Sequence, residues 1–141
     1  MALDTHVSTS PEKHVKQTSA LGIHIIAELD GCALMPDEDA LATLLSSAAL
    51  VGHAQLLNIH VHGFGDGAGV AGVALLAESH ISVHTWPEFQ YAAVDVFMCG
   101  AAANPEAALE ILVTGMQASH VRVEKLRRDS QPPENFPPFG Q

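Results

Sequence analysis

The chain has 141 residues, a formal net charge of −10 and a hydrophobic share of 48%, which together fit one globular domain with enough apolar material to close a core. The acidic balance opposes the phosphate neutralisation that nucleic-acid binding requires, and it favours a cationic small molecule as the ligand. The longest apolar stretch, Gly69 to Ala77, is far shorter than the roughly 20 residues that cross a bilayer, and the N-terminus lacks a signal-peptide core, so we expect no membrane segment and a cytoplasmic protein.

The first part of the chain predicts a flexible arm, a strand, a helix and a second strand. Residues 1–19 are polar and show no periodicity, which is typical of a flexible arm. Gly22 to Leu29 reads as a strand, and the acidic run Pro36 to Asp39 predicts the start of a helix that continues to about His53. Gln55 to Phe64 alternates between apolar and polar residues, which predicts a strand whose apolar face includes Leu57, Ile59 and Val61.

The middle of the chain predicts an antiparallel meander. Gly65 to Gly69 is too rich in glycine for a regular element and is expected to be a loop. Three candidate strands follow it, at Val70 to Ala77, Ser79 to Trp86 and Tyr91 to Cys99. Their short connections favour hydrogen bonding between neighbours in the sequence.

The last part predicts a helix, a strand and a tail. Asn104, Pro105 and Glu106 combine a capping side chain, a residue suited to the first helical position and an acidic first turn, so a helix is expected to run to about Ser119. Its apolar stripe of Leu109, Leu112, Val113 and Met116 is interpreted as core. His120 to Leu126 is the last candidate strand, and residues 129–141 form a proline-rich tail.

The order of these elements indicates an α+β fold, with helices on one face of a mainly antiparallel sheet in a two-layer sandwich. We expect residues 20–128 to form a single domain. The other face of the sheet then needs a cover, and a second copy of so short a chain is the expected source of it. The prediction is therefore a homodimer packed sheet to sheet, with four layers in the order αββα.

Several side chains are candidates for chemistry on spacing alone. Cys32 and Cys99 are too few for a disulfide framework, so free thiols are expected. His60 and His62 share a strand face and could join His80 or His84 as metal ligands, although no cysteine or carboxylate ligand spacing accompanies them. Ser79 and His84 could form a hydrolase pair, but the G-x-S-x-G elbow is absent.

The segment from Glu78 to Gly100 reads ESHISVHTWPEFQYAAVDVFMCG. It resembles the processing and active-site segment of the prokaryotic S-adenosylmethionine decarboxylases, with its ESH, HTWPE and YAA motifs, an acidic residue and a closing Cys-Gly. The similarity extends more thinly to Leu21–His24, Ala27–Glu28 and residues 62–70, and covers most of Leu21 to Val123.

The resemblance implies a self-processing, pyruvoyl-dependent carboxy-lyase that feeds polyamine (spermidine) synthesis. The chain would be cut between Glu78 and Ser79, and Ser79 would become the pyruvoyl group, with no metal or PLP required. The resemblance places His84 as the base that promotes elimination during processing. The ketone would form a Schiff base with the substrate amine and take up the electrons released with carbon dioxide. Cys99 is then placed as the proton donor.

The resemblance also implies a substrate site. Phe64 matches an aromatic position against the adenine and near the sulfonium of S-adenosylmethionine, and Glu88 matches a position that binds the ribose hydroxyls. Two departures from the family pattern stand near these residues. Ala71 replaces a serine that assists processing, a role that Ser82 could take over, and the glycine-rich loop carries Asp66, which could pair with a guanidinium or ammonium group. The alternatives are therefore a decarboxylase of arginine or ornithine, and an unprocessed, non-catalytic binding or regulatory partner.

Overall fold

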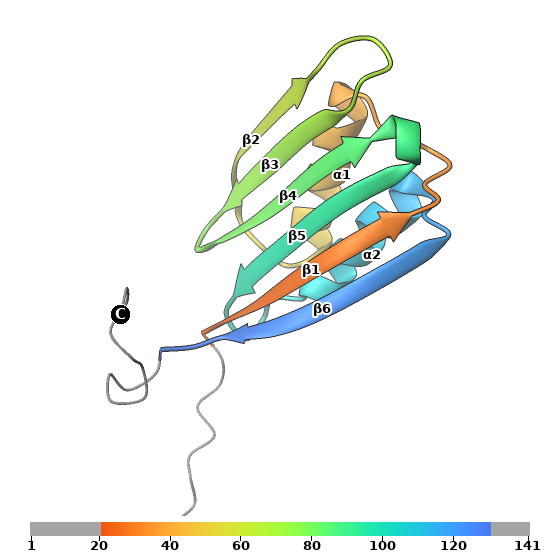
Figure 1. Cartoon of the computed structure of the whole chain (residues 1–141). Coiled ribbons are helices and arrows are strands. Elements are labelled where there is room, and N and C mark those ends of the chain that lie inside the picture. Colours follow the sequence, from red (N-terminus) through yellow and green to blue (C-terminus); the bar gives the residue numbers. More distant parts are fainter. Residues whose placement is uncertain (1–20, 131–141) are drawn as a thin grey trace, which may run out of the picture.

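The computed structural model describes residues 21–130 and arranges them as one antiparallel sheet with two α-helices on one of its faces (Figure 1). In chain order the elements are β1 (Gly22–Asp30), α1 (Glu38–Val51), β2 (Leu56–Gly63), β3 (Val70–Leu76), β4 (Ser79–Trp86), the 3-10 turn η1 (Pro87–Phe89), β5 (Tyr91–Cys99), α2 (Pro105–Met116) and β6 (His120–Arg128). The strands lie in the order β2-β3-β4-β5-β1-β6.

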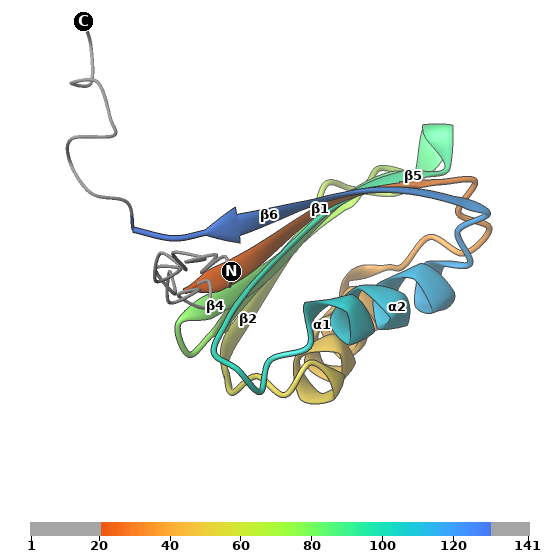
Figure 2. The same cartoon turned by 90° about the horizontal axis from the view of Figure 1, so that it is seen from below.

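The two faces of the sheet differ in what covers them. Both α-helices lie against one face, and within the described residues no α-helix lies on the other, which we call the outer face (Figure 2). The covered face carries the core, built from the alternate apolar residues of β1, β3, β4 and β5 and from the facing stripes of the helices: Ile25, Leu29, Leu41, Leu45, Leu76, Ile81, Val83, Val94, Val96, Leu112 and Met116. This burial of apolar surface is the main force that holds the two layers together.

The helix starts follow from their capping residues. Asp37 accepts a hydrogen bond from the amide of Ala40, and Asn104 accepts one from the amide of Ala107, so each helix begins with one of its free N–H groups satisfied. Acidic side chains in both first turns complement the helix dipole. These capping residues fix where α1 and α2 begin.

The α+β fold expected from the sequence is confirmed, with the same elements in the same order. The predicted bounds of β4 and β5 match the structure, and both helices end a few residues earlier than expected. Leu57 does not join the apolar face of β2, because the register of β2 against β3 shifts between Leu56 and Asn58, and this side chain is 55% exposed. The arm expected at residues 1–19 lies outside the described residues, as does the predicted tail from residue 131 on.

Candidate active site

The expected cleavage position lies at the tight turn between β3 and β4. Leu76 and Ser79 are register partners, so Ala77 and Glu78 alone form the connection. Glu78 has φ +61°, in the left-handed region that residues other than glycine seldom occupy. The peptide bond between Glu78 and Ser79 therefore follows a residue held in an uncommon backbone conformation.

Ser79 is the first residue of β4 and lies on the covered face. Its side chain is buried together with those of Ile81 and Val83, which alternate with it along the strand. The amide of Cys99 donates a hydrogen bond to Ser79 Oγ at 3.0 Å. The serine hydroxyl is thus fixed against the end of β5.

Cys99 lies at the same end of the sheet, with its thiol on the outer face. Its register partner on β1 is Gly22, and a side chain at Gly22 would stand 2.6 Å from the ring of Phe97 and 3.1 Å from Cys99 Sγ. A side chain at Gly22 would therefore collide with the Phe97 ring, so glycine is what lets this ring pack across the start of β1 beside the thiol. The backbone of Cys99 is thus brought to Ser79 Oγ, whereas the Cys99 thiol and the Ser79 side chain lie at the same sheet end on opposite faces.

His84 is not brought to Ser79 within one chain. β4 pairs in regular register with β3 and β5, so His84 alternates onto the outer face, where it is exposed, whereas Ser79 faces the helices. The two residues also stand near opposite ends of the strand. The irregularity that would let them meet is not present along β4.

His84 instead lines a hollow of about 340 Å³ at the far end of β4, together with Phe64, Glu88 and Trp86. The Trp86 ring stacks on His84 at 6.2 Å and on Tyr91 at 5.3 Å between centroids. Two of the three residues expected to hold the substrate, Phe64 and Glu88, are thus gathered around one aromatic-walled hollow. The structure adds Trp86 to them.

Asp66 does not line this hollow. It lies in the β2–β3 loop and borders a neighbouring depression whose other carboxylates are Asp37 and Glu38. The sequence places Asp66 close to Phe64 in the chain, but the loop carries the two side chains to different depressions.

The departure at Ala71 leaves a small hollow on the outer face. Ala71 is the register partner of both His62 on β2 and His84 on β4, and a hollow of about 220 Å³ is lined by these residues and by His60 and Ser82. Ser82 Oγ donates to Asp95 Oδ2 at 3.3 Å, so the hydroxyl considered as a replacement already has an acceptor. Residues 21–130 contain no group of three or more His, Cys, Asp or Glu side chains arranged to hold a metal ion.

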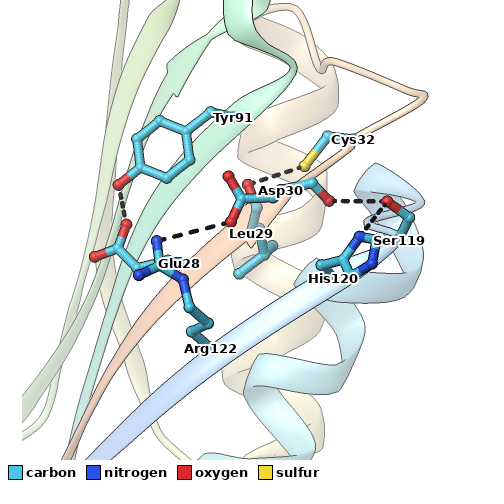
Figure 3. A network of polar contacts seen from close by, with 8 residues as sticks. All are labelled: Glu28, Leu29, Asp30, Cys32, Tyr91, Ser119, His120 and Arg122. Atoms are coloured by element: carbon cyan, nitrogen blue, oxygen red, sulfur yellow. Dashed lines mark hydrogen bonds and ion pairs between the residues drawn. The ribbon is translucent and has the colours of Figure 1, made fainter.

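A polar network that the sequence analysis did not single out lies at the end of β1 (Figure 3). The Tyr91 hydroxyl donates to Glu28, and Arg122 forms an ion pair with Asp30 at 3.8 Å. The Cys32 thiol donates to the carbonyl of Leu29, and burial, with the charge of Asp30 as a second cause, raises the pKa of this thiol. The strict alternation of β1, which turns Glu28 and Asp30 outward, was the available signal in the sequence.

A comparison with protein-family models matches residues 23–129 to the model described as S-adenosylmethionine decarboxylase. The chain belongs to the S-adenosylmethionine decarboxylase family. The match includes the whole described sheet except Gly22, and with it the turn that precedes Ser79 and the hollow around Phe64.

Individual relatives agree with this assignment. The chain is 47% identical over 112 residues to an S-adenosylmethionine decarboxylase proenzyme of Prochlorococcus marinus, covering 78% of this chain and 91% of the relative. It is 42% identical over 105 residues to the proenzyme of Pyrobaculum aerophilum, covering 73% and 84% of the two chains. The crystal structure of the adenosylmethionine decarboxylase from Aquifex aeolicus matches with a TM-score of 0.68 at 30% identity, covering 82% of this chain and 96% of that one. None of the helices within residues 21–130 is long and apolar enough to span a membrane.

Proposed function

We propose that this protein cuts its own chain between Glu78 and Ser79 and then, with the pyruvoyl group that residue 79 has become, decarboxylates S-adenosylmethionine to supply an aminopropyl donor for spermidine synthesis. Family membership supports the proposal. The observation that carries it is the placement of Ser79 directly after a strained two-residue turn, with Cys99 beside it. The cytoplasmic location expected from the sequence stays a prediction.

The cutting step uses residues of the chain itself. Ser79 Oγ attacks the carbonyl carbon of Glu78, the Glu78–Ser79 C–N bond breaks, and an ester joins the two residues. A base then removes the α-proton of Ser79, the Cβ–Oγ bond breaks, and Oγ leaves as part of the new carboxylate of Glu78. Hydrolysis of the remaining dehydroalanine releases its nitrogen as ammonia and leaves a ketone.

Two features of the turn favour this step. The amide of Cys99, which donates to Ser79 Oγ, fixes the position of that oxygen and stabilises it once its proton has been removed. The left-handed conformation of Glu78 costs on the order of 1–3 kcal/mol, and this strain is released when the bond beside it breaks.

The residues around position 79 fit the group that cutting would leave there. A pyruvoyl group supplies a ketone conjugated to a carbonyl, which takes up electrons released from a bonded substrate. The thiol of Cys99 stands half-buried on the outer face at the same sheet end, and it is the group there that can return a proton to substrate.

In the proposed site, the hollow with Phe64, Glu88 and His84 comes from one copy of the chain, and Ser79 and Cys99 come from a second copy. The hollow opens near the far end of β4, and the thiol of Cys99 lies on the same outer face near the other end of the sheet. In a homodimer packed by its outer faces, a two-fold axis that runs across the strands brings one end of each sheet to the opposite end of its partner. Each site then combines Ser79 and Cys99 of one copy with Phe64, His84 and Glu88 of the other, and His84 is the base for its partner's Ser79.

Mass spectrometry of the intact protein tests the cut. The wild type should give two pieces, one ending at Glu78 and one beginning at residue 79 with a ketone that reacts with hydrazine, whereas Ser79→Ala should give one uncut chain. An uncut wild type without a reactive carbonyl contradicts the proposal and favours a non-catalytic relative.

Borohydride trapping tests the substrate. The cut protein is incubated with S-adenosylmethionine, arginine or ornithine in turn and reduced with borohydride, and the masses of its two pieces are then measured. We expect S-adenosylmethionine alone to become attached to the piece beginning at residue 79. Attachment of arginine or ornithine in its place would overturn the substrate assignment and leave the cutting chemistry standing.

A further inference from the structure

A cluster of rings occupies the outer face directly beside the proposed cleavage position. His80, the residue after Ser79, and His24 of β1 are both register partners of Phe97 on β5. Their imidazoles meet edge to face at 6.0 Å between centroids, and each lies 5.5–5.6 Å from the Phe97 ring. The three rings therefore pack β1, β5 and the start of β4 against one another.

Charged groups hold this cluster from both sides. Arg128 of β6 places its guanidinium over the Phe97 ring at 5.5 Å and its Nη1 3.1 Å from His24 Nδ1. Because an arginine can only donate, Nδ1 of His24 accepts and the proton of a neutral ring is on Nε2. That nitrogen is buried without a hydrogen-bond partner and faces Asp95 Oδ1 at 3.7 Å. The ring of His24 is thus fixed in one orientation.

The cut would remove several of the bonds that hold residue 79 in place. The peptide link to Glu78 is lost, the nitrogen that carries its amide N–H leaves as ammonia, and Oγ, the acceptor of the Cys99 amide, departs with Glu78. The peptide link to His80 is then the one covalent link of residue 79 to the chain. His80 is then the first residue of the new chain that still has a complete backbone and a packed side chain.

We propose that the ring cluster of His24, His80 and Phe97, clamped by Arg128, is an anchor that holds the chain end at residue 79 in place beside Cys99 after the cut. His80 is a positioning residue in this arrangement, since it acts through the residue that precedes it. The inference rests on the proposed function, because the anchor is needed only once the turn between β3 and β4 has been broken.

Two substitutions of His80 separate anchoring from other roles. His80→Ala removes the ring, so we expect cutting to proceed as in the wild type, kcat to fall about tenfold and KM to change by less than about twofold. His80→Phe keeps a ring that packs on Phe97 and His24, so we expect it to recover most of the lost kcat. If His80→Phe is impaired as strongly as His80→Ala, or if His80→Ala is not cut, the anchor is overturned.

Hydrogen exchange gives a readout besides activity. In the cut protein, His80→Ala should speed exchange of the amides at the start of β4, whereas in the uncut Ser79→Ala background the same substitution should leave those amides unchanged. Equal acceleration in both backgrounds would overturn the inference, because it would show a general role in stability.

Arginine substitutions on β6 supply a matched pair that leaves β4 intact. Arg128→Leu removes the clamp, and Arg122→Leu removes a guanidinium from the same strand that pairs with Asp30 instead. We expect a fall in kcat of a few fold for Arg128→Leu and wild-type kcat for Arg122→Leu. Equal effects of the two would count against the clamp. An uncut wild type would overturn both this inference and the proposed function, whereas failure of the ring rescue in a cut protein overturns the anchor alone.

Discussion

The two cysteines show how position in the fold separates residues of one type. Cys32 lies in the loop after β1 and is 1% exposed, and its thiol donates to the carbonyl of Leu29. Cys99 lies half-buried at the end of β5 with Gly22 beside it. A thiol in the core acts as a small hydrophobic group, whereas a half-buried thiol at a sheet end is placed for proton transfer.

The raised pKa of Cys32 predicts that this thiol resists alkylation in the native protein. Because desolvation and, secondly, Asp30 disfavour the thiolate, the reactive form is scarcer at neutral pH than in an unfolded chain. Iodoacetamide should therefore label Cys32 only after guanidinium is added, as shown by peptide mass spectrometry. Native labelling of Cys32 at the rate of a free thiol would contradict this reading, and the Cys32→Ala variant identifies the labelled peptide.

Among the elements, α2 and β6 are linked by an ion pair between Glu106 and Lys125. The hydrogen bond from Lys125 is the largest cause that lowers the pKa of Glu106, and burial opposes it. A lowered pKa in the folded chain means that the pair stabilises the protein at neutral pH and that this contribution is lost as the pH falls through and below the usual range of a glutamate.

Glu106→Gln should therefore reduce the free energy of unfolding by about 0.5 kcal/mol near neutral pH, a small value because both side chains are about half exposed. The difference from the wild type should shrink when the pH is lowered well below the usual range of a glutamate, because protonation of Glu106 removes its charge from the wild type. Urea unfolding at the two pH values measures it. Glu110→Gln, one turn further along the same helix, is the control, and a loss of equal size there would argue against a specific pair.

Gly69 lies where the loop after β2 enters β3, and its lack of a side chain is required by the neighbouring strand. An added Cβ would stand 1.9 Å from the carbonyl oxygen of Thr85, a backbone atom that cannot move aside without shifting β4. We expect Gly69→Ala to cost about 2 kcal/mol or more of stability and to raise KM, because Gly69 borders the hollow with Phe64 and Glu88. Thermal unfolding and steady-state kinetics measure the two effects, with Ala68→Ser as the control; unchanged stability would contradict the clash.

The helices and strands were predictable because each has its own periodicity or capping residues, but the contacts between residues of different elements were not. Alternation in β4 already placed Ser79 and His84 on opposite faces, and the structure keeps them apart. Periodicity does not predict the order of strands in a sheet. The sequence therefore contained no sign of the ring cluster, in which His24 and His80 come from distant parts of the chain and meet beside Phe97. Asp66 shows the same limit in a loop: nearness to Phe64 in sequence did not predict which depression it borders.

At the scale of the whole molecule, the exposed outer face and the separation of Ser79 from His84 both favour a homodimer with shared sites. Ser79→Ala and His84→Ala chains should each be inactive alone. In a mixed dimer one site retains an intact Ser79 facing an intact His84, so co-expression should restore about a quarter of wild-type activity if the chains pair at random. Activity assays of the unfractionated co-expressed chains measure this, and mixed dimers purified through a separate tag on each chain should show about half of wild-type activity. No recovery in verified mixed dimers would show that each site is built within one copy.

The strand order has a further consequence for a chain that is cut between β3 and β4. The first piece keeps β1, β2 and β3, and the second keeps β4, β5 and β6, yet β1 lies between β5 and β6. The pieces are interleaved, so neither can be withdrawn without breaking the sheet along both edges of β1. The sheet therefore forms most readily before the chain is cut. Once denatured, the cut protein can refold only when its two fragments meet, so its folding rate should depend on concentration. The uncut Ser79→Ala chain should fold at a rate that does not depend on concentration.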